Sequence, residues 1–532
     1  MIGNLDPQRS FAYSILPPGF IPEDAIHLRI ANTVRQVLSV EDFIEAYCVD
    51  NGRPSYDPVM MTTALLLGLN FNLSDREMEH ATRYDLCWKI ALGLPIEHKG
   101  ICNSTFSHFR TRLVRNSLDL EIFDKCVEAC RISGLLTDTA LQVIDSTLIE
   151  GAAATQDTFT LIKTALRKVL REAKKSNESL EQKIRGSLKR KDYDEHGKSK
   201  IDWEDPEARR GLLEEMVRDA ETAKKIVEES GDKDQRLTEA VELLDRVSHQ
   251  DIEEVDGKIE LKEGVAKDRV ISTNDPEMRH GHKSSKGRVD GYKAHLVVEP
   301  KSGVITDVGV GFANGMDDAE TPGAIDRLEG RGIKPEELAG DCAYGSGDAR
   351  EEADKKDVEV ISKVARTTNP GGMFSKQDFQ IDLEAGKVTC PGGQTTTKYR
   401  MVKDGKKKRR VKAFVFAVEV CAACPLREQC TKNKKSGRTI RLNYHEGRLQ
   451  EARKYQETEE FKEKYSNRPV AERTIADFKQ HGGAKSRYIG IRKTKLQVVL
   501  TAVVVNIKKL GRWIFEKKAG VSLRGEYAHM MV

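Results

Sequence analysis

The spacing of apolar positions divides the chain into segments of different kinds. In residues 1–135 apolar side chains recur every three to four positions, which is the helical period. Asp57 precedes one such segment, and Ser74 with Glu77 forms a capping box in front of the next. The chain is therefore predicted to begin with an all-helical domain over residues 1–135.

From Leu141 onward the apolar spacing shortens to that of strands. The run through Val143 and Ile144 predicts a buried strand that reaches about Thr147. The later order is strand, strand, helix, strand, helix and strand, with strands at 291–299, 303–310, just before 341, and at 358–364. We expect Asp317 and Asp318 to cap the helix in this series. Asp307 is expected to be an exposed strand position.

A charged stretch, residues 157–262, separates the first strand from the others. Apolar stripes of helical period recur within it at 161–170, 212–227 and 237–247, each among charges of both signs. These stripes predict amphipathic helices that form an inserted hairpin or bundle. A coiled-coil surface for a partner is an equally open alternative.

Composition limits the class of protein. A chain of 532 residues is expected to form two to four domains, and a charged fraction of 32% is typical of a helix-rich soluble protein. The longest apolar run, Leu496–Ile507, is too short and too interrupted for a membrane span and is expected to be core packing. No secretion signal is expected. The net charge of +4 says little, because 88 basic and 84 acidic residues nearly cancel.

Basic residues are nevertheless concentrated locally. Residues 397–441 contain 15 Lys or Arg against 3 Asp or Glu. This segment includes the run Lys406, Lys407, Lys408, Arg409 and Arg410. A glycine-punctuated segment further on adds Lys485, Arg487 and Arg492. Such segments suit a phosphate backbone, although a solvated basic loop has the same composition.

A third N-terminal helix, opening at Asn103, also carries basic residues. Its apolar stripe consists of Phe106, Phe109 and Leu113. The side chains expected to point away from that stripe are Arg110, Arg112 and Arg115. This helix either reads DNA or presents an ordinary solvated face.

Ten cysteines in a chain without an expected export signal argue against a disulfide framework. Four of them cluster: Cys390, Cys421, Cys424 and Cys430. Their spacing predicts a closed tetrahedral zinc site with a structural role, with a metal-free reduced cluster or an iron–sulfur cluster as alternatives. The other six are expected to be small buried hydrophobes: Cys48, Cys87, Cys102, Cys126, Cys130 and Cys342.

The most informative motif lies near the C-terminal end, in YSNRPVAERTIADFK. At about 3.6 residues per turn, Arg468, Glu472 and Lys479 fall on one face of a helix, and Tyr465 precedes it. Pro469 suits the first turn of that helix. One carboxylate therefore stands among side chains that suit DNA.

This spacing resembles the Y-R-E-K signature of bacterial insertion-sequence DDE transposases. That family also requires two upstream aspartates at strand ends. Asp145 follows the first buried strand and is followed by Ser-Thr, and Asp341 opens an Asp-x-x-Tyr sequence that ends at Tyr344. The resemblance continues through 281–299 and 315–325.

The resemblance implies an α/β RNase H-like catalytic domain, a mixed sheet with flanking helices. This domain is expected to be built from residues 136–156, 263–365 and 446–532. The helical insertion at 157–262 and a small basic, cysteine-rich insertion at 366–445 would interrupt it. The all-helical domain would recognise terminal inverted repeats.

The resemblance also implies the chemistry. Asp145, Asp341 and Glu472 would hold two Mg²⁺ or Mn²⁺ ions, because these cations prefer oxygen ligands. Arg468 and Lys479 would hold phosphates beside them, and Tyr465 would bind a phosphate or a base. The partners would be terminal-repeat and target DNA, with at least a homodimer in the DNA complex. The expected location is the bacterial cytoplasm.

Two other functions share these features. One is an inactive or domesticated DNA-binding protein that retains the fold. The other is a nuclease of the same fold that cleaves DNA without joining strands.

Overall fold

The structure is a computed structural model of the chain. It describes residues 2, 17, 19–48, 54–195, 197–255, 257–266, 268–284, 287–366, 369–404, 409–433 and 435–517. Among these residues, no helix is both long enough and apolar enough to cross a membrane.

The N-terminal part is helical, as the sequence predicts. Its helices are α1 (Ile26–Val37), α2 (Pro58–Asn70), α3 (Asp75–Tyr84), α4 (Leu86–Leu92), α5 (Asn103–Arg115) and α6 (Leu118–Ile132), with a 3₁₀ turn at Val40–Ala46. Asp57 caps α2 by accepting the backbone N–H of Met60 at 2.9 Å. The capping box of Ser74 and Glu77 at α3 is confirmed. Local capping therefore fixes where these helices begin.

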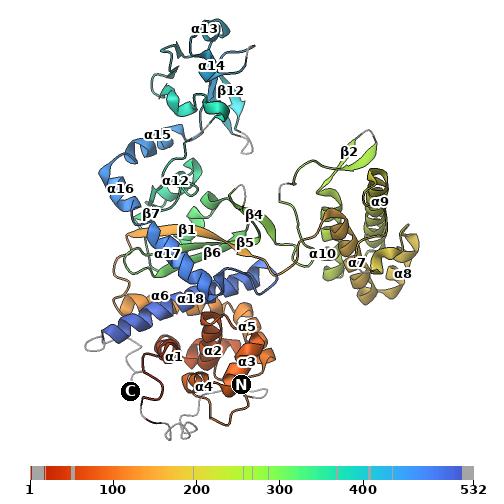
Figure 1. The fold of residues 1–532 in the computed structure, drawn as a ribbon, viewed down its shortest axis with the longest axis vertical. Helices are drawn as coiled ribbons and strands as arrows, with labels where there is room; N and C mark the ends of the chain where they lie inside the picture. Colours follow the sequence, from red (N-terminus) through yellow and green to blue (C-terminus); the bar gives the residue numbers. More distant parts are fainter. Residues whose placement is uncertain are drawn as a thin grey trace.

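A mixed sheet forms the centre of the molecule (Figure 1). Its strands are β1 (Leu141–Glu150), β4 (Arg279–Ser284), β5 (Gly287–Val298), β6 (Ile305–Phe312), β7 (Glu337–Ala339) and β8 (Glu359–Ile361). The strand order is β4-β5-β1-β7-β8, and β6 pairs with β5. Strand β5 is antiparallel to β1, β4 and β6, whereas β1, β7 and β8 are parallel. Helix α11 (Thr321–Gly330) follows β6, and α12 (Gly347–Asp354) follows β7. This mixed α/β arrangement is compatible with an RNase H-like transposase domain.

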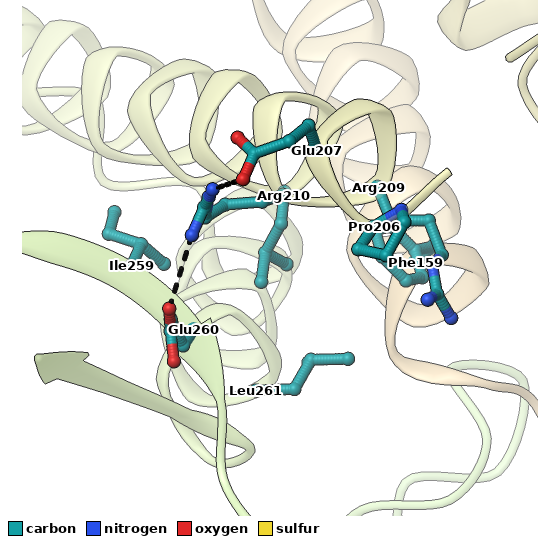
Figure 2. Close-up of a pocket in the computed structure, with 9 residues that line it drawn as sticks. Phe159, Pro206, Glu207, Arg209, Arg210, Ile259, Glu260 and Leu261 are labelled. Carbon is teal, nitrogen blue, oxygen red and sulfur yellow. Dashed lines mark hydrogen bonds and ion pairs between the residues drawn. The ribbon is translucent and has the colours of Figure 1, made fainter. Parts of the chain in front are cut away.

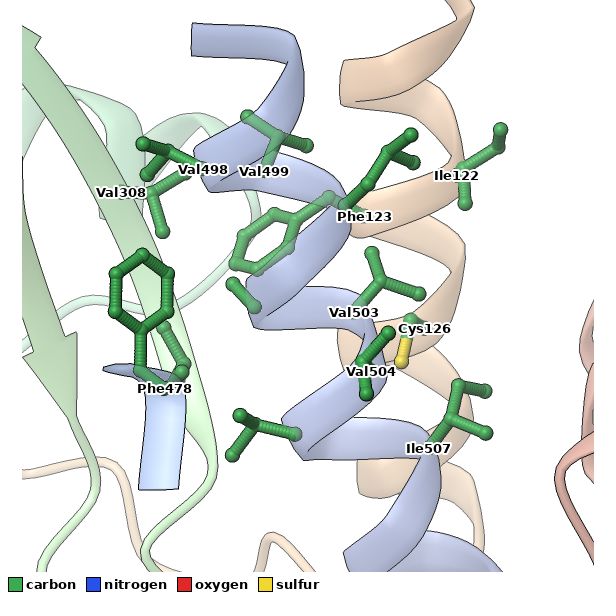
Figure 3. Packing of buried hydrophobic residues seen from close by; sticks show 14 of the residues in the cluster. Ile122, Phe123, Cys126, Val308, Phe478, Val498, Val499, Val503, Val504 and Ile507 are labelled. Carbon is green, nitrogen blue, oxygen red and sulfur yellow. The ribbon is translucent and has the colours of Figure 1, made fainter. Parts of the chain in front are cut away.

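One long helix, α18 (Ile491–Glu516), joins the sheet to the N-terminal helices. It packs against β6 on one side and against α1, α2 and α6 on the other (Figure 1). Figure 3 shows Val503 and Ile507 of α18 beside Cys126 of α6. Apolar side chains surround most of its length, as expected for a buried helix. The predicted core role of this helix is confirmed, and one hydrophobic cluster spans the sheet and the N-terminal helices.

A group of helices between β1 and β4 has a hydrophobic cluster of its own. Its elements are α7 (Thr158–Ser176), α8 (Glu178–Ser187), α9 (Pro206–Ser230), α10 (Gln235–His249) and the hairpin β2 (Ile252–Val255) and β3 (Lys258–Leu261). The apolar stripes predicted here are buried against one another. Figure 2 shows Arg210 of α9 contacting Glu207 and, at 3.3 Å, Glu260 of β3 beside a cavity of ≈ 320 Å³.

The cysteine-rich part contains two small three-stranded sheets. Their strands are β9 (Gln380–Asp382), β10 (Lys387–Thr389), β11 (Thr395–Thr396), β12 (Tyr399–Lys403), β13 (Arg410–Val415) and β14 (Thr439–Arg441), with short helices α13 (Val418–Ala422) and α14 (Arg427–Cys430). A third hydrophobic cluster, which includes Phe379, Phe414 and Phe416, supports them. The chain then returns to the sheet through α15 (Glu446–Tyr455), α16 (Glu459–Tyr465) and α17 (Pro469–Phe478).

Two expectations about acidic residues are wrong. Asp307 is fully buried and forms ion pairs with Arg327 at 2.8 Å and Arg331 at 2.7 Å, because β6 faces α11 at this position. Asp317 accepts Lys293 at 2.9 Å instead of capping a helix. Glu320 occupies the N-cap of α11 without a side-chain hydrogen bond, so Asp318 does not cap it either.

The expectation for the scattered cysteines is only partly right. Cys126 and Cys130 are buried in α6, and Cys87 is half-buried. Cys48, Cys102 and Cys342 are exposed, because each lies at the end of an element or in a connecting segment.

Candidate active site

The parallel register of β1 and β7 brings two aspartates to the same level of the sheet. Val143 pairs with Ala339, and Asp145 and Asp341 each follow two residues later in the same direction. Neighbouring strands lie about 4.8 Å apart. Asp145 accepts the N–H of Ser146 at 2.8 Å, and Asp341 accepts the N–H of Ala343 at 2.8 Å. The backbone therefore fixes both carboxylates, although they lie far apart in the sequence.

Helix α17 adds the glutamate. It packs against β1 and β5 with Glu472 in its first turn. Burial raises the pKa of Asp145, and the negative charges of Asp341 and Glu472 raise it further. The N–H of Ser146 and the cation of Arg468 oppose these effects. Asp145, Asp341 and Glu472, here called the carboxylate cluster, thus act on one another electrostatically.

Arg468 is the cation of this site. It occupies the N-cap position of α17, and its Nη2 contacts Glu472 Oε1 at 2.7 Å. Its Nε is buried without a hydrogen-bond partner among the described residues. A buried donor without an acceptor is costly, so this guanidinium has capacity for a further oxygen ligand.

The other two residues of the motif lie at opposite ends of the same region. Tyr465 ends α16, just before α17, and its ring stacks on Phe461 with centroids 5.3 Å apart. Lys479 follows the last residue of α17, roughly 10 Å along the helix from Glu472. The structure thus places Asp341, Arg468 and Glu472 near enough to Asp145 to act on its charge, and Lys479 lies at the far end of α17 from Glu472.

A buried pair behind the carboxylates was not assigned a role from the sequence. The Tyr344 hydroxyl and His295 Nδ1 are 2.8 Å apart, and His295 pairs with Ser146 across β5 and β1. Burial raises the pKa of Tyr344 and lowers the pKa of His295. The pair ties the turn that carries Asp341 to β5, which is hydrogen-bonded to the strand that carries Asp145. The Asp-x-x-Tyr spacing pointed to Tyr344, but no sequence signal pointed to His295.

The four clustered cysteines line one small cavity. Its volume is ≈ 30 Å³, and its lining includes the thiols of Cys390, Cys421, Cys424 and Cys430, here called the thiol cluster. A Cβ placed on Gly392 would lie 3.4 Å from Cys424 Sγ and 3.7 Å from Cys390 Sγ. The N–H of Arg438 donates to Cys421 Sγ at 3.4 Å. Burial raises the pKa of Cys430, and the other three thiols raise it further.

Neither the carboxylate cluster nor the thiol cluster has the geometry of a formed metal site. Among the described residues, no group of three or more His, Cys, Asp or Glu side chains is arranged to hold a metal ion. Both metal assignments therefore remain predictions.

Several arginines predicted to bind DNA contact the protein itself. Arg110 pairs with Asp75, and Arg112 lies 3.9 Å from the centre of the Tyr47 ring. Arg115 is exposed at the end of α5. These contacts leave the DNA-binding role of α5 untested.

The basic residues near the C-terminal end that were predicted to bind DNA also form contacts within the protein. Arg487 donates to Leu73 O at 2.6 Å, and Arg492 donates twice to Asp119 at 2.8 Å. Lys485 pairs with Glu150 at 2.8 Å. Arg487 and Arg492 thus join α18 and the segment before it to the N-terminal helices.

The basic run of the cysteine-rich part is only partly visible. Arg409 pairs with Asp348 at 2.6 Å, and Arg410 begins β13. Lys406, Lys407 and Lys408 lie outside the described residues.

Comparison with known families identifies the class. Residues 389–511 match a family described as "Transposase DDE domain", and residues 19–112 match one described as "Transposase domain (DUF772)". The first match contains Glu472 and the thiol cluster, while Asp145 and Asp341 lie outside both. No curated protein and no solved structure matches the chain.

Both matched families are transposase families. These matches support a DNA transposase function, in which a DDE domain performs DNA cleavage and strand transfer.

Proposed function

We propose that this transposase cleaves DNA at terminal inverted repeats and joins the freed 3′ end to target DNA, using Asp145, Asp341 and Glu472. The observation that carries this proposal is the convergence of these carboxylates from β1, from the turn after β7, and from α17. The transposase matches support it.

The carboxylate cluster suits divalent cations. Its donors are all oxygens, and the charges of Asp341 and Glu472 disfavour ionisation of the half-buried Asp145. A bound cation would relieve this repulsion, and Mg²⁺ or Mn²⁺ suits such a set. Two such ions, when bound, activate the attacking oxygen and stabilise the leaving 3′ oxygen. Asp145 would be the ligand shared by the two ions, because the charges of both Asp341 and Glu472 act on it.

Arg468 has a second role in this proposal. Without DNA it neutralises Glu472, and its Nε has no acceptor. A phosphate oxygen beside the cluster would satisfy that donor with a charge-assisted hydrogen bond. Arg468 would then hold the DNA backbone while Glu472 faces the metal, with Tyr465 and Lys479 contacting the same strand on either side.

The thiol cluster is proposed to hold a structural zinc ion. Four thiols around one small cavity, with a backbone N–H donated to Cys421, match the requirements of a closed site. Four thiolates leave no open position, so the ion would stabilise the surrounding small sheets and take no part in the reaction. The basic residues nearby, including Arg409 and Arg410, would then be presented to DNA by a rigid element.

We also propose roles for the other parts of the chain. The sheet with α11, α12, α17 and α18 would be the RNase H-like domain, interrupted by α7–α10 and by the cysteine-rich part. The N-terminal helices would read the terminal repeats, aided by Arg115. The active assembly would be at least a homodimer, acting in the bacterial cytoplasm.

The test is cleavage of a labelled duplex that carries the terminal repeat of the protein's own element, with Mg²⁺. The wild type should cut at the repeat boundary, and Glu472→Gln should reduce the rate by roughly 1,000-fold or more. Glu463→Gln is the matched control, because Glu463 is an exposed glutamate of α16 away from the carboxylate cluster. Binding without metal-dependent cutting by the wild type would overturn the proposal.

A further inference from the structure

A basic cavity lies at the C-terminal end of α18, where this helix meets α1, α17 and the β5–β6 turn. Its volume is ≈ 390 Å³. The charged residues that line it are Arg29, Lys508, Lys509, Arg512, Asp477 and Glu516. Cations thus outnumber carboxylates, and none of these residues belongs to the carboxylate cluster or to the thiol cluster.

The two carboxylates leave half of this positive charge uncompensated. Asp477 is engaged by His481 at 3.1 Å and by Lys508 at 3.3 Å, and the hydrogen bond from His481 is the main reason that its pKa falls to about 2. Glu516 is exposed in the last turn of α18 and forms no ion pair with the described residues.

Three cations of the cavity have unused donors. Among the described residues, Lys509 and Arg512 form no hydrogen bond or ion pair, and Arg29 Nε is buried without a partner. Lys509 is held against the β5–β6 turn, since a Cβ on Gly303 would lie 2.5 Å from its Nζ. Partial burial there lowers the pKa of Lys509. A buried donor such as Arg29 Nε is normally satisfied by an acceptor.

The buried carboxylate of Glu299 does not supply an acceptor to Lys509. Glu299 accepts the N–H groups of Lys301 and Ser302, each at 2.7 Å, within its own turn. Its hydrogen-bonding capacity is therefore directed away from Lys509. The cavity remains a concave site with unpaired donors from α1 and α18, which suits a tetrahedral oxyanion.

We infer that this cavity, formed by Arg29, Lys509 and Arg512, binds a phosphate group of double-stranded DNA. The inference rests on the proposed function for the choice of DNA as the source of the phosphate. The contact is independent of base sequence, because its acceptor is a phosphate group and not a base edge. It joins α1, which lies in the matched N-terminal family, to α18, which packs against β6 of the main sheet. DNA bound here would therefore clamp the N-terminal helices to the catalytic sheet.

The test is the salt dependence of binding to labelled duplexes, one with the terminal repeat and one of unrelated sequence. Lys509→Ala and Arg512→Ala should each reduce the slope of log K against log salt by about one. Each should weaken binding of both duplexes roughly tenfold, the effect of losing one charge-assisted contact. Arg512 is exposed, so its variant keeps the test valid if Lys509→Ala fails to fold. Lys183→Ala, which removes an exposed lysine of α8, should change neither quantity.

Results that would contradict this inference differ from those that would contradict the proposed function. Wild-type slopes and affinities in both pocket variants would overturn the inference and leave the proposed function intact. Calorimetry with inorganic phosphate distinguishes the source: phosphate binding lost in Arg512→Ala, with DNA affinity unchanged, would make the cavity a free-anion site and overturn the DNA assignment. Loss of metal-dependent cleavage by the wild type would instead contradict the proposed function, whatever the pocket variants do in binding.

Discussion

The carboxylate cluster and the thiol cluster are both candidate metal sites, yet the chain builds them differently. The carboxylates come from three segments that are separated by more than a hundred residues, and the main sheet positions two of them. The thiols come from one short region and rest on a small hydrophobic cluster of their own. The main sheet shares a large hydrophobic cluster with the N-terminal helices, whereas the cysteine-rich part has only a small one. We therefore expect metal loss to stop catalysis at one site and to unfold the other.

The largest expected effect is on catalysis. Asp341→Asn should reduce cleavage by roughly 1,000-fold or more, because it would replace a proposed metal ligand while the amide oxygen can still accept the N–H of Ala343. Circular dichroism should show an intact fold. Asp357→Asn is the control, since Asp357 is exposed and Asn tolerates its positive φ of 57°. Equal activity of Asp341→Asn and wild type would remove Asp341 from the site.

The second effect is structural. The purified chain should contain about one zinc ion, and chelation should make residues 366–445 sensitive to protease while the sheet stays protected. Cys424→Ser should make residues 366–445 sensitive to protease even without a chelator. Cys102→Ser, which alters an exposed thiol of the N-terminal part, should retain the metal. A metal-free wild type that resists protease would show that the thiol cluster is stable in the reduced state.

A smaller effect, on the free energy of unfolding, is expected from the buried pair of Tyr344 and His295. Tyr344→Phe leaves the buried His295 without its hydroxyl partner, which should reduce the free energy of unfolding by roughly 1–3 kcal/mol. Denaturant titration measures this change. Tyr399→Phe is the control, because Tyr399 is half exposed on β12. Equal losses in the two variants would argue against the buried pair as a specific anchor.

The smallest expected effect is an increase in the free energy of unfolding when Asp145 is replaced. Because burial and neighbouring carboxylates raise the pKa of Asp145, the folded chain holds this proton more tightly than the unfolded chain. The ionised carboxyl therefore reduces stability as the pH rises above the ordinary aspartate range. Without metal, Asp145→Asn should be more stable than wild type at pH 7 by roughly 0.5–2 kcal/mol, with little difference near pH 3. A variant less stable than wild type at pH 7 would contradict this.

The sequence predicted the elements better than the environment of single side chains. Capping residues such as Asp57 and Ser74 act locally, so the helix starts followed from sequence alone. The burial of Asp307 did not, because it depends on Arg327 and Arg331 of α11, which come near only after β6 and α11 pack. Alternation along a strand cannot distinguish a solvated carboxylate from one covered by a helix.

The candidate site shows the same limit. Spacing identified Glu472 and Arg468 because both lie on one helix. Asp145 and Asp341 were found because the sequence around each resembles a family motif. Only the register of β1 and β7 explains why the two residues lie at the same level of the sheet. His295 has no local signal, since its importance arises from a cross-strand position and a contact with Tyr344. The basic cavity was also missed, because its cations come from opposite ends of the chain.

The central claim is that Asp145, Asp341 and Glu472 share metal ions. Iron-directed cleavage tests it most directly: Fe²⁺ replaces Mg²⁺, and with ascorbate and peroxide it cuts the backbone near its ligands. Mass spectrometry should find cuts near all three residues, suppressed together by excess Mg²⁺ and absent in Glu472→Gln. Cuts that omit one of the three positions, or that persist in excess Mg²⁺, would contradict a shared metal site.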